Sequence, residues 1–178
     1  QIPLVVFVWD DGYGISVPKK YQTSKGSISE ALSGMQKEEH TNGISIYEVK
    51  GWDYAGLCET FEKGVKEARE QHIPVLFHVS EVTQPQGHST SGSHERYKSK
   101  ERLDWERDFD PLKKMKEWLL SNSLATEDEL ALIEEQAKQD AKQPRDIAWA
   151  NYQQPIKKQV ERAAELIKSL MPAIPAAS

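Results

Sequence analysis

Two adjacent carboxylates, Asp10 and Asp11, directly follow an apolar run and precede Gly12, Tyr13 and Gly14. Side-chain and backbone oxygens in such a loop can bind a hard cation such as Mg²⁺, above all when phosphate groups supply the other ligands. The alternative is a simple turn at the end of a strand, in which the aspartates cap backbone amides. The spacing alone leaves both interpretations open.

A second polar segment runs from Thr83 to His94 and contains His88 between Gly87 and Ser89. A histidine in a polar loop suits acid–base chemistry or the orientation of a reaction intermediate. The alternative is a solvated loop in which the histidines are incidental. The spacing from His88 to His94, without a nearby cysteine, is not that of a zinc site.

The elements that must position these two loops alternate between strands and helices. Strand-like runs cover 4–9, 44–49 and 75–79, with a weak helix over 28–39 and a stronger one over 54–70 between them. Near-continuous apolar runs alternating with helices are typical of a parallel α/β sheet. Ligands bind beyond the carboxyl ends of such strands, so the two polar loops, which leave the first and third strands, are expected at one edge.

Two other chemically capable side chains are expected to be structural. His78 lies inside the third apolar run, where a packed and hydrogen-bonded side chain is the simplest interpretation. Cys58 lies beside the apolar face of the 54–70 helix and is expected to be a buried thiol. A single cysteine excludes an internal disulfide framework, so a reducing cytoplasm is the expected location.

Composition supports a globular chain whose front half is rich in loops. The 178 residues are 38% hydrophobic and carry a net charge of -5, with no basic block of the kind that marks a nucleic-acid or polybasic membrane surface. The longest apolar run, Pro3 to Trp9, is too short to span a bilayer. All ten glycines lie between Gly12 and Gly92, which indicates loops in that part of the chain.

The chain is expected to divide near residue 100. Residues 1–100 would form part of an α/β domain, 101–171 a helical extension packed on it, and 172–178 a flexible tail. Three helices are expected in the back half, over 110–121, 126–142 and 153–170. The second begins with the capping box of Thr126 and Glu129 and is expected to stop before Pro144.

Three stretches keep an order and spacing found in one known family. They are the run from Ile2 to Ser16, the turn Lys50-Gly51-Trp52-Asp53 and the segment from Pro74 to Tyr97, followed by Glu101, Trp105 and Asp110-Pro111. Together they resemble the later half of the α-subunit part of the thiamine-diphosphate-dependent 2-oxo acid dehydrogenases, the decarboxylating first component of the pyruvate and branched-chain complexes. The resemblance extends from about Ile2 to Ala141. It implies a thiamine-diphosphate-binding α/β fold, of which this chain holds a parallel sheet of about three strands with flanking helices and a C-terminal helical extension.

The resemblance also implies roles for five residues. In the family an asparagine side chain and a tyrosine backbone carbonyl bind the Mg²⁺ that anchors the cofactor diphosphate, and these roles fall on Asp11 and Tyr13. Ile15 and Ser89 are the other implied cofactor-binding positions. His88 is the implied catalytic residue, which would stabilise or protonate intermediates and assist the lipoyl step. Ser89 would shape its loop, and the matching serine is a phosphorylation site in some relatives.

The sequence departs from the family pattern at charged positions. The asparagine pair is Asp10-Asp11 here, one arginine is replaced by Gln84, an acidic residue by Gly92 and another arginine by Lys98. The upstream segment with the other Mg²⁺ ligand lies outside this sequence, as does the β-type domain. We therefore expect the isolated chain to be inactive and to bind neither thiamine diphosphate nor Mg²⁺ measurably.

The resemblance implies that the complete protein decarboxylates a 2-oxo acid and passes the acyl group to a lipoyl domain of the acyltransferase component. Its implied partner is a β-type domain or subunit in an oligomer, without nucleic-acid or membrane partners. The run from Gly87 to Ser91 slightly favours 2-oxoisovalerate over pyruvate as substrate. The alternative, favoured by Asp10-Asp11 and Gln84, is a non-catalytic structural or assembly module that keeps the fold without the cofactor.

Overall fold

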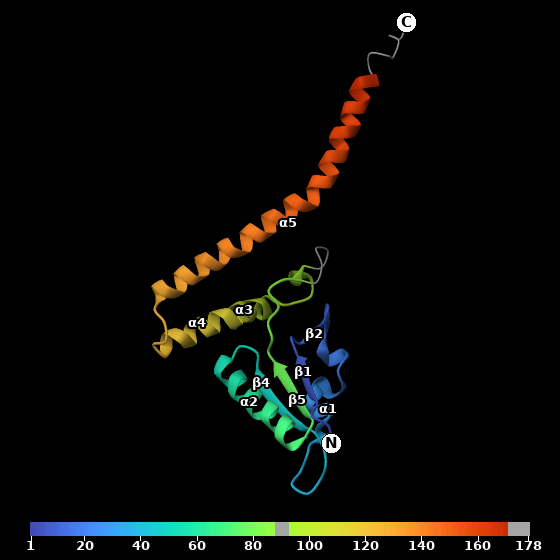
Figure 1. Cartoon of the computed structure of the whole chain (residues 1–178). Helices are drawn as coiled ribbons and strands as arrows, with labels where there is room; N and C mark the ends of the chain where they lie inside the picture. Colours follow the sequence, from blue (N-terminus) through green and yellow to red (C-terminus); the bar gives the residue numbers. More distant parts are fainter. Residues whose placement is uncertain (88–92, 171–178) are drawn as a thin grey trace. The chain divides into compact units, whose positions relative to one another are not determined.

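Figure 1 shows the computed structural model of the chain, in which residues 1–87 and 93–170 are described. The chain forms two units, Gln1–Leu124 and Ala125–Ser178. Helices α1 to α4 and the strands belong to the first unit, and helix α5 belongs to the second. The expected boundary near residue 100 and the packing of an extension on the front part stay predictions, and the expected tail lies outside the described residues.

The main sheet consists of three parallel strands: β1 (Val5–Trp9), β4 (Ser45–Lys50) and β5 (Val75–Ser80). Their order is β1-β5-β4, and Val5 and Ser45 both pair with Val75 of the central strand. β5 is buried from Val75 to Val79, as its near-continuous apolar run predicts for a strand covered on both faces. The predicted parallel α/β sheet is confirmed.

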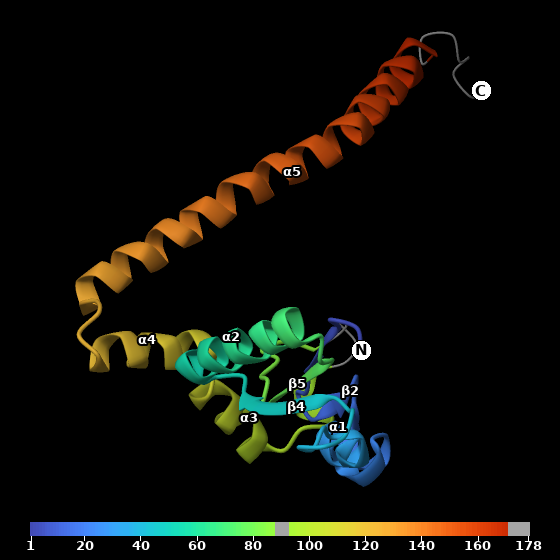
Figure 2. The ribbon, with the colours of Figure 1, turned by 60° about the horizontal axis from the view of Figure 1, so that its bottom comes forward.

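Helix α2 (Tyr54–Gln71) covers one face of this sheet, as Figure 2 shows. It confirms the helix predicted over 54–70, with the side chain of Asp53 as its cap. Three buried residues form the centre of the core: Ala68, Val75 and Phe77. Gly64 lies against Phe77, because a Cβ at this position would stand 2.5 Å from the Phe77 Cζ atom. Glycine therefore allows the close approach of helix and sheet.

Short elements connect β1 to β4: the antiparallel pair β2 (Tyr13–Gly14) and β3 (Val17–Pro18), the 3₁₀ turns η1 (Lys19–Tyr21), η2 (Ser24–Gly26) and η3 (Ser33–Met35), and α1 (Ile28–Ala31). The prediction of one helix over 28–39 is wrong. Only α1, a single turn capped by Ser27, is α-helical there. Gly34 interrupts the segment, because glycine loses more backbone entropy in a helix than other residues.

Three further elements complete the first unit: η4 (His94–Arg96), α3 (Lys100–Asp108) and α4 (Pro111–Ser121). α4 confirms the helix predicted over 110–121, and Asp110 caps it by accepting hydrogen bonds from Leu112 N and Lys113 N. Helix α3 was not predicted from the sequence, because its residues are mostly polar and show no clear apolar face. Ser99 caps it by accepting a hydrogen bond from Arg102 N at 3.2 Å.

Helix α5 (Glu127–Leu170) forms the second unit, and none of its residues is buried. Thr126 and Glu129 make the expected capping box, with Glu129 N donating to Thr126 Oγ1 at 3.3 Å. The predictions of a stop before Pro144 and of a separate later helix are wrong, because α5 continues through Pro144 and Pro155. Each proline removes one hydrogen bond, but strong helix formers surround both prolines and sustain the helix. No helix in the described part of the chain is long and apolar enough to cross a membrane.

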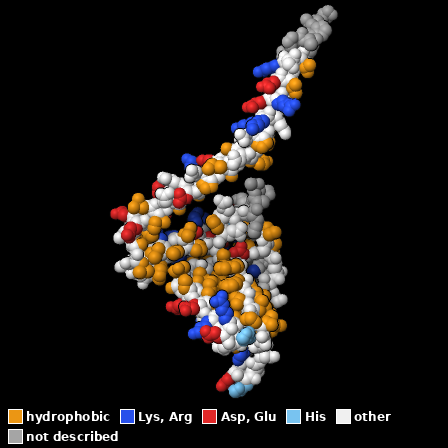
Figure 3. Space-filling view, viewed as in Figure 1, with side chains coloured by type: hydrophobic (Ala, Val, Ile, Leu, Met, Phe, Trp, Pro, Cys, Tyr) orange, Lys and Arg blue, Asp and Glu red, His pale blue; other side chains and the backbone are white. Residues whose placement is uncertain are grey.

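Strand β1 lies at an outer edge of the sheet, and within the described residues it pairs only with β5. Val6, Phe7 and Trp9 are exposed, with 60% of Trp9 accessible. Phe7 and Trp9 also contact the ring of Phe61 in α2, so an aromatic cluster extends from the core to the surface. Hydrophobic side chains gather on the face of this unit that Figure 3 shows.

Replacing Gly64 by alanine tests the contact between α2 and the sheet. Gly64→Ala is expected to lower the free energy of unfolding by about 1–3 kcal/mol, the usual range for overpacking, because the added methyl meets the Phe77 ring. Gly34→Ala is the control, since no heavy atom lies within 4 Å of a Cβ at Gly34. Urea unfolding followed by circular dichroism measures both variants. Equal stability losses would contradict the contact.

Candidate functional site

The loops that follow β1 and β5 leave the sheet side by side. Asp10 N donates to Val79 O at 2.8 Å, and Val82 N donates to Asp10 O at 3.1 Å. The two segments therefore stay hydrogen-bonded to each other just beyond the ends of the strands. This places the acidic loop, residues 10–14, and the start of the Thr83–Gly87 segment at the carboxyl edge of the sheet, as the parallel strands predict.

The exit of β5 is shaped by Glu81, whose backbone is left-handed at φ 56°. Its carboxylate accepts a hydrogen bond from Trp52 Nε1 at 2.7 Å and another from Lys50 Nζ. Partial burial raises the pKa of Glu81, but these hydrogen bonds outweigh it and lower the pKa below its ordinary value. Glu81 thus stays ionised and ties the segment after β5 to the segment after β4.

The Asp10 carboxylate stabilises the acidic loop through its hydrogen bonds. Its Oδ1 accepts from Gly12 N at 2.8 Å, and its Oδ2 accepts from Lys19 Nζ at 2.6 Å and from His78 Nε2 at 2.9 Å. Gly12 adopts a φ of 84°, a conformation that favours glycine. Burial would raise the pKa of Asp10, but hydrogen bonds from Lys19, His78 and Gly12 lower it. For Asp10 the turn interpretation is therefore correct.

Asp11 is the carboxylate of the pair that can serve a ligand. Its Oδ1 accepts from Tyr13 N at 3.0 Å, and among the described residues no hydrogen bond is seen to its second oxygen. Its backbone carbonyl accepts from Arg102 Nη2 at 2.8 Å. The loop is thereby fixed to α3, while one carboxylate oxygen of Asp11 remains available.

The carbonyl of Tyr13 points away from the strand that Tyr13 pairs with. In the β2–β3 hairpin Tyr13 lies opposite Pro18. Lys19 N donates to Gly12 O at 2.9 Å, so Gly12 and Lys19 form a hydrogen-bonded pair, and the adjacent Tyr13–Pro18 pair is of the non-hydrogen-bonded kind, whose backbone groups face outward. Asp11 and Tyr13 therefore present a carboxylate and a carbonyl oxygen, which are the ligand types that Mg²⁺ prefers.

A buried ion pair supports the loop from below. The Lys98 side chain is 1% exposed, and its Nζ donates to the two Glu106 carboxylate oxygens at 2.8 and 3.0 Å. Arg102 Nε donates to the same carboxylate at 2.8 Å. Lys98 Nζ also lies 5.2 Å from the centroid of the Tyr13 ring, against which the Tyr97 ring packs edge-on. Two cations thus share one buried carboxylate directly beneath the loop.

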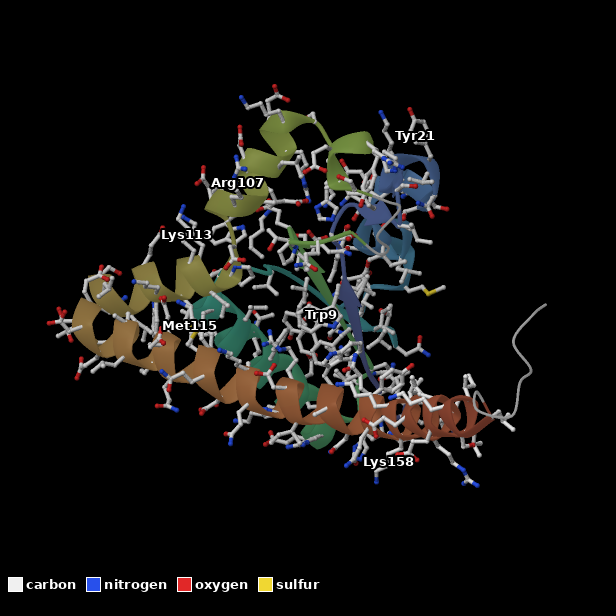
Figure 4. All side chains as sticks on the ribbon, turned by 90° about the horizontal axis from the view of Figure 1, so that it is seen from above. Trp9, Tyr21, Arg107, Lys113, Met115 and Lys158 are labelled. Carbon is white, nitrogen blue, oxygen red and sulfur yellow. The ribbon has the colours of Figure 1, made fainter. Side chains whose placement is uncertain are left out.

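Two cavities open at this edge of the sheet. The smaller, about 180 Å³, borders the acidic loop and is lined by Asp10, Asp11, Tyr13, Lys19 and Trp9 among others. The larger, about 380 Å³, lies between the Thr83–Gly87 segment and α3. Thr83 Oγ1 and His94 Nε2, both on its wall, are buried with no hydrogen-bond partner among the described residues. Figure 4 labels one lining residue of each cavity, Trp9 and Arg107.

The structure places some of the residues predicted for the site and leaves others untested. Asp11 and Tyr13 lie together in the acidic loop. Ile15 lies at the tip of the hairpin, 68% exposed, with a left-handed φ of 60°. His88 and Ser89 lie outside the described residues. Within 1–87 and 93–170 no cluster of three or more His, Cys, Asp or Glu side chains could hold a metal ion.

Sequence reasoning missed the residues that support the loop. The only local signal was the four-residue spacing of Arg102 and Glu106, which places them on one side of α3, whereas Lys98 lies before the helix begins. The expectation that His78 is a packed, hydrogen-bonded side chain is confirmed, because it is 3% exposed. The expectation of a buried thiol is wrong, since Cys58 is exposed.

Comparison with known proteins gives a consistent result over most of the chain. A family model described as "Dehydrogenase E1 component" matches residues 1–157. The pyruvate dehydrogenase E1 component subunit alpha of Porphyra purpurea is 28% identical over 151 residues, which cover 85% of this chain and 41% of that protein. The proteins of the same name from Rickettsia bellii and Rickettsia felis are 24% and 26% identical over 144 residues, 80% of this chain and 41% of theirs. The chain thus spans about two fifths of these relatives' length.

Removing the shared carboxylate tests the support beneath the loop. Glu106→Gln is expected to lower the free energy of unfolding by about 3–5 kcal/mol, because it leaves the buried Lys98 ammonium without its partner. Asp108→Asn is the control, since it removes a carboxylate from an exposed pair with Lys113 and should change stability little. Guanidinium unfolding compares the two variants. A small effect of Glu106→Gln would contradict the buried pair.

Proposed function

The chain belongs to the dehydrogenase E1 component family, and from this premise we propose that it is the α-type part of a thiamine-diphosphate-dependent 2-oxo acid dehydrogenase. The complete protein decarboxylates a 2-oxo acid and transfers the acyl group to a lipoyl domain. The observation that supports this most directly is the acidic loop, where Asp11 and the Tyr13 carbonyl offer two hard oxygen ligands at the carboxyl edge of the sheet.

The donor set fits Mg²⁺ bound to a diphosphate. Magnesium keeps near-octahedral coordination and in phosphate sites takes one or two protein carboxylates together with phosphate oxygens. Asp11 would supply the carboxylate and Tyr13 the carbonyl, and the other ligands would come from the diphosphate and from protein outside this chain. When bound, thiamine diphosphate would supply the nucleophilic carbon and the electron sink for loss of carbon dioxide.

The surrounding charges favour this role despite the two aspartates. Asp10 is paired with Lys19 and hydrogen-bonded to His78, so its charge is largely compensated within the fold. Arg102 donates to the Asp11 carbonyl and brings a positive charge beneath the loop. Within the described residues Asp11 is thus the carboxylate of the pair without a salt bridge, and the Asp10 departure from the family pattern gives little support to a non-catalytic module.

For His88 and Ser89 the proposal rests on the family resemblance. His88 would hold or transfer a proton at the reacting carbon, and Ser89 would shape its loop and contact the cofactor. Ile15 is proposed as a further cofactor contact from the hairpin tip. Gly87, the last described residue before His88, lines the larger cavity.

The substrate, partners and location are further parts of the proposal. The relatives compared are pyruvate dehydrogenase subunits by name, whereas the run from Gly87 to Ser91 favours 2-oxoisovalerate. Both acids are therefore candidate substrates. A β-type domain or subunit would complete the cofactor site, a lipoyl domain would accept the acyl group, and a cytoplasmic oligomer is the proposed form.

Replacing Asp11 in the full-length protein, combined with its β-type part, tests this function. Wild type is expected to bind thiamine diphosphate only with Mg²⁺ and to decarboxylate pyruvate or 2-oxoisovalerate with an artificial electron acceptor. Asp11→Ala is expected to weaken Mg²⁺-dependent cofactor binding by about 100-fold or more, the loss of a direct ligand exceeding the 10–100-fold typical of outer-shell changes. Calorimetry and initial rates measure these effects.

One control and two contradicting outcomes complete this test. Asp108→Asn, an exposed carboxylate on α3, should leave cofactor binding and turnover unchanged. Wild-type protein that neither binds the cofactor nor acts on any 2-oxo acid would refute the enzyme and favour the structural module. Tight Mg²⁺-dependent binding by residues 1–178 alone would refute the expectation that this chain holds only part of the site.

A further inference from the structure

A buried chain of hydrogen bonds runs from α1 through the central strand to the acidic loop. Ser29 Oγ lies 2.6 Å from His78 Nδ1, and His78 Nε2 lies 2.9 Å from Asp10 Oδ2. Ser29 is 5% exposed and His78 3% exposed. A polar side chain in the middle of a buried strand is unfavourable unless it is hydrogen-bonded, and here both ring nitrogens are.

The direction of the bond at Asp10 follows from the other donors to its carboxylate. Lys19 Nζ and Gly12 N both donate to Asp10, so this carboxylate is the acceptor end of the chain. His78 therefore donates from Nε2 to Asp10, and its Nδ1 is held by the hydrogen bond with the Ser29 hydroxyl.

This arrangement is not that of a serine nucleophile. In a hydrolytic triad the serine oxygen must reach a bound substrate, whereas Ser29 is a buried residue of α1. The three groups serve to hold Asp10 instead. His78 and Lys19 both bond Asp10 Oδ2, His78 from β5 and Lys19 from the residue that follows β3.

We propose that His78, oriented by Ser29, is a positioning residue for the acidic loop: it fixes Asp10 so that Asp11 and the Tyr13 carbonyl face the ligand. The identity of that ligand, Mg²⁺ with a diphosphate, rests on the proposed function. The fixing of the loop does not, because it follows from the bonds of Asp10 to Gly12, Lys19 and His78.

Hydrogen exchange tests the positioning without any cofactor. In the full-length protein His78→Leu is expected to speed amide exchange in the segment 10–14 by about tenfold, the equivalent of one hydrogen bond to a charged group. His78→Gln, whose amide can still donate to Asp10, should recover most of the protection. Ser29→Ala removes only a hydroxyl and should give a smaller increase, and it decides the question if His78→Leu does not fold.

Tyr47→Phe is the matched control on the opposite face of the sheet. Tyr47 Oη donates to Glu67 Oε2 at 2.7 Å, and burial together with this carboxylate raises the pKa of Tyr47 to about 12. The variant therefore also loses a partly buried charged hydrogen bond, but far from the acidic loop. It should leave exchange in 10–14 unchanged. Faster exchange in His78→Leu spread equally over β4 and β5 would show a general stabilising role and overturn the proposal.

A second measurement connects the loop to the ligand. The Mg²⁺ concentration that half-saturates thiamine diphosphate binding is expected to rise about tenfold in His78→Leu, as for other outer-shell changes, and to stay unchanged in Tyr47→Phe. An unchanged Mg²⁺ requirement with a loosened loop would overturn the proposal. If the loop loosens as expected but wild type binds no cofactor, the proposed function fails and the fixing of the loop by His78 stands.

Discussion

The hydrogen bonding of β5 to a strand on each side is the constraint on which the first unit depends. A central parallel strand has no solvent for its backbone or for either row of side chains, so it must be apolar and its neighbours must be in register. Val75 pairs with both Val5 and Ser45, and this register makes all three strands end at one edge. The acidic loop and the Thr83–Gly87 segment meet there for that reason. His78, the one ionisable side chain inside β5, reaches the loop from this fixed position.

The elements that sequence predicts well are those whose pattern is local. The apolar runs before Asp10 and before Ser80 are β1 and β5, and the periodic run after Asp53 is α2. Asp11 and Tyr13 are identified through the family resemblance, because their position after a strand leaves the turn interpretation open. The partners of the loop could not be identified from the sequence, since His78 and Arg102 are 68 and 91 residues from the aspartates that they contact. Such pairings depend on tertiary packing that no local pattern records.

The fold gives the two aspartates that depart from the family pattern different surroundings. Asp10 accepts hydrogen bonds from Gly12, Lys19 and His78. Within the described residues, the Asp11 carboxylate accepts one backbone amide on one oxygen. Lys98, in place of an arginine, is almost wholly buried against Glu106. An ammonium is a compact charge that one carboxylate can satisfy, whereas a guanidinium has five donors to place.

The exposed edge of β1 has a consequence for what this unit can bind. No strand of the described residues pairs with its outer side, beside which Phe7 and Trp9 are exposed. Such an edge is a template for another strand. A further strand placed there would add a row of backbone hydrogen bonds to β1 and enlarge the sheet.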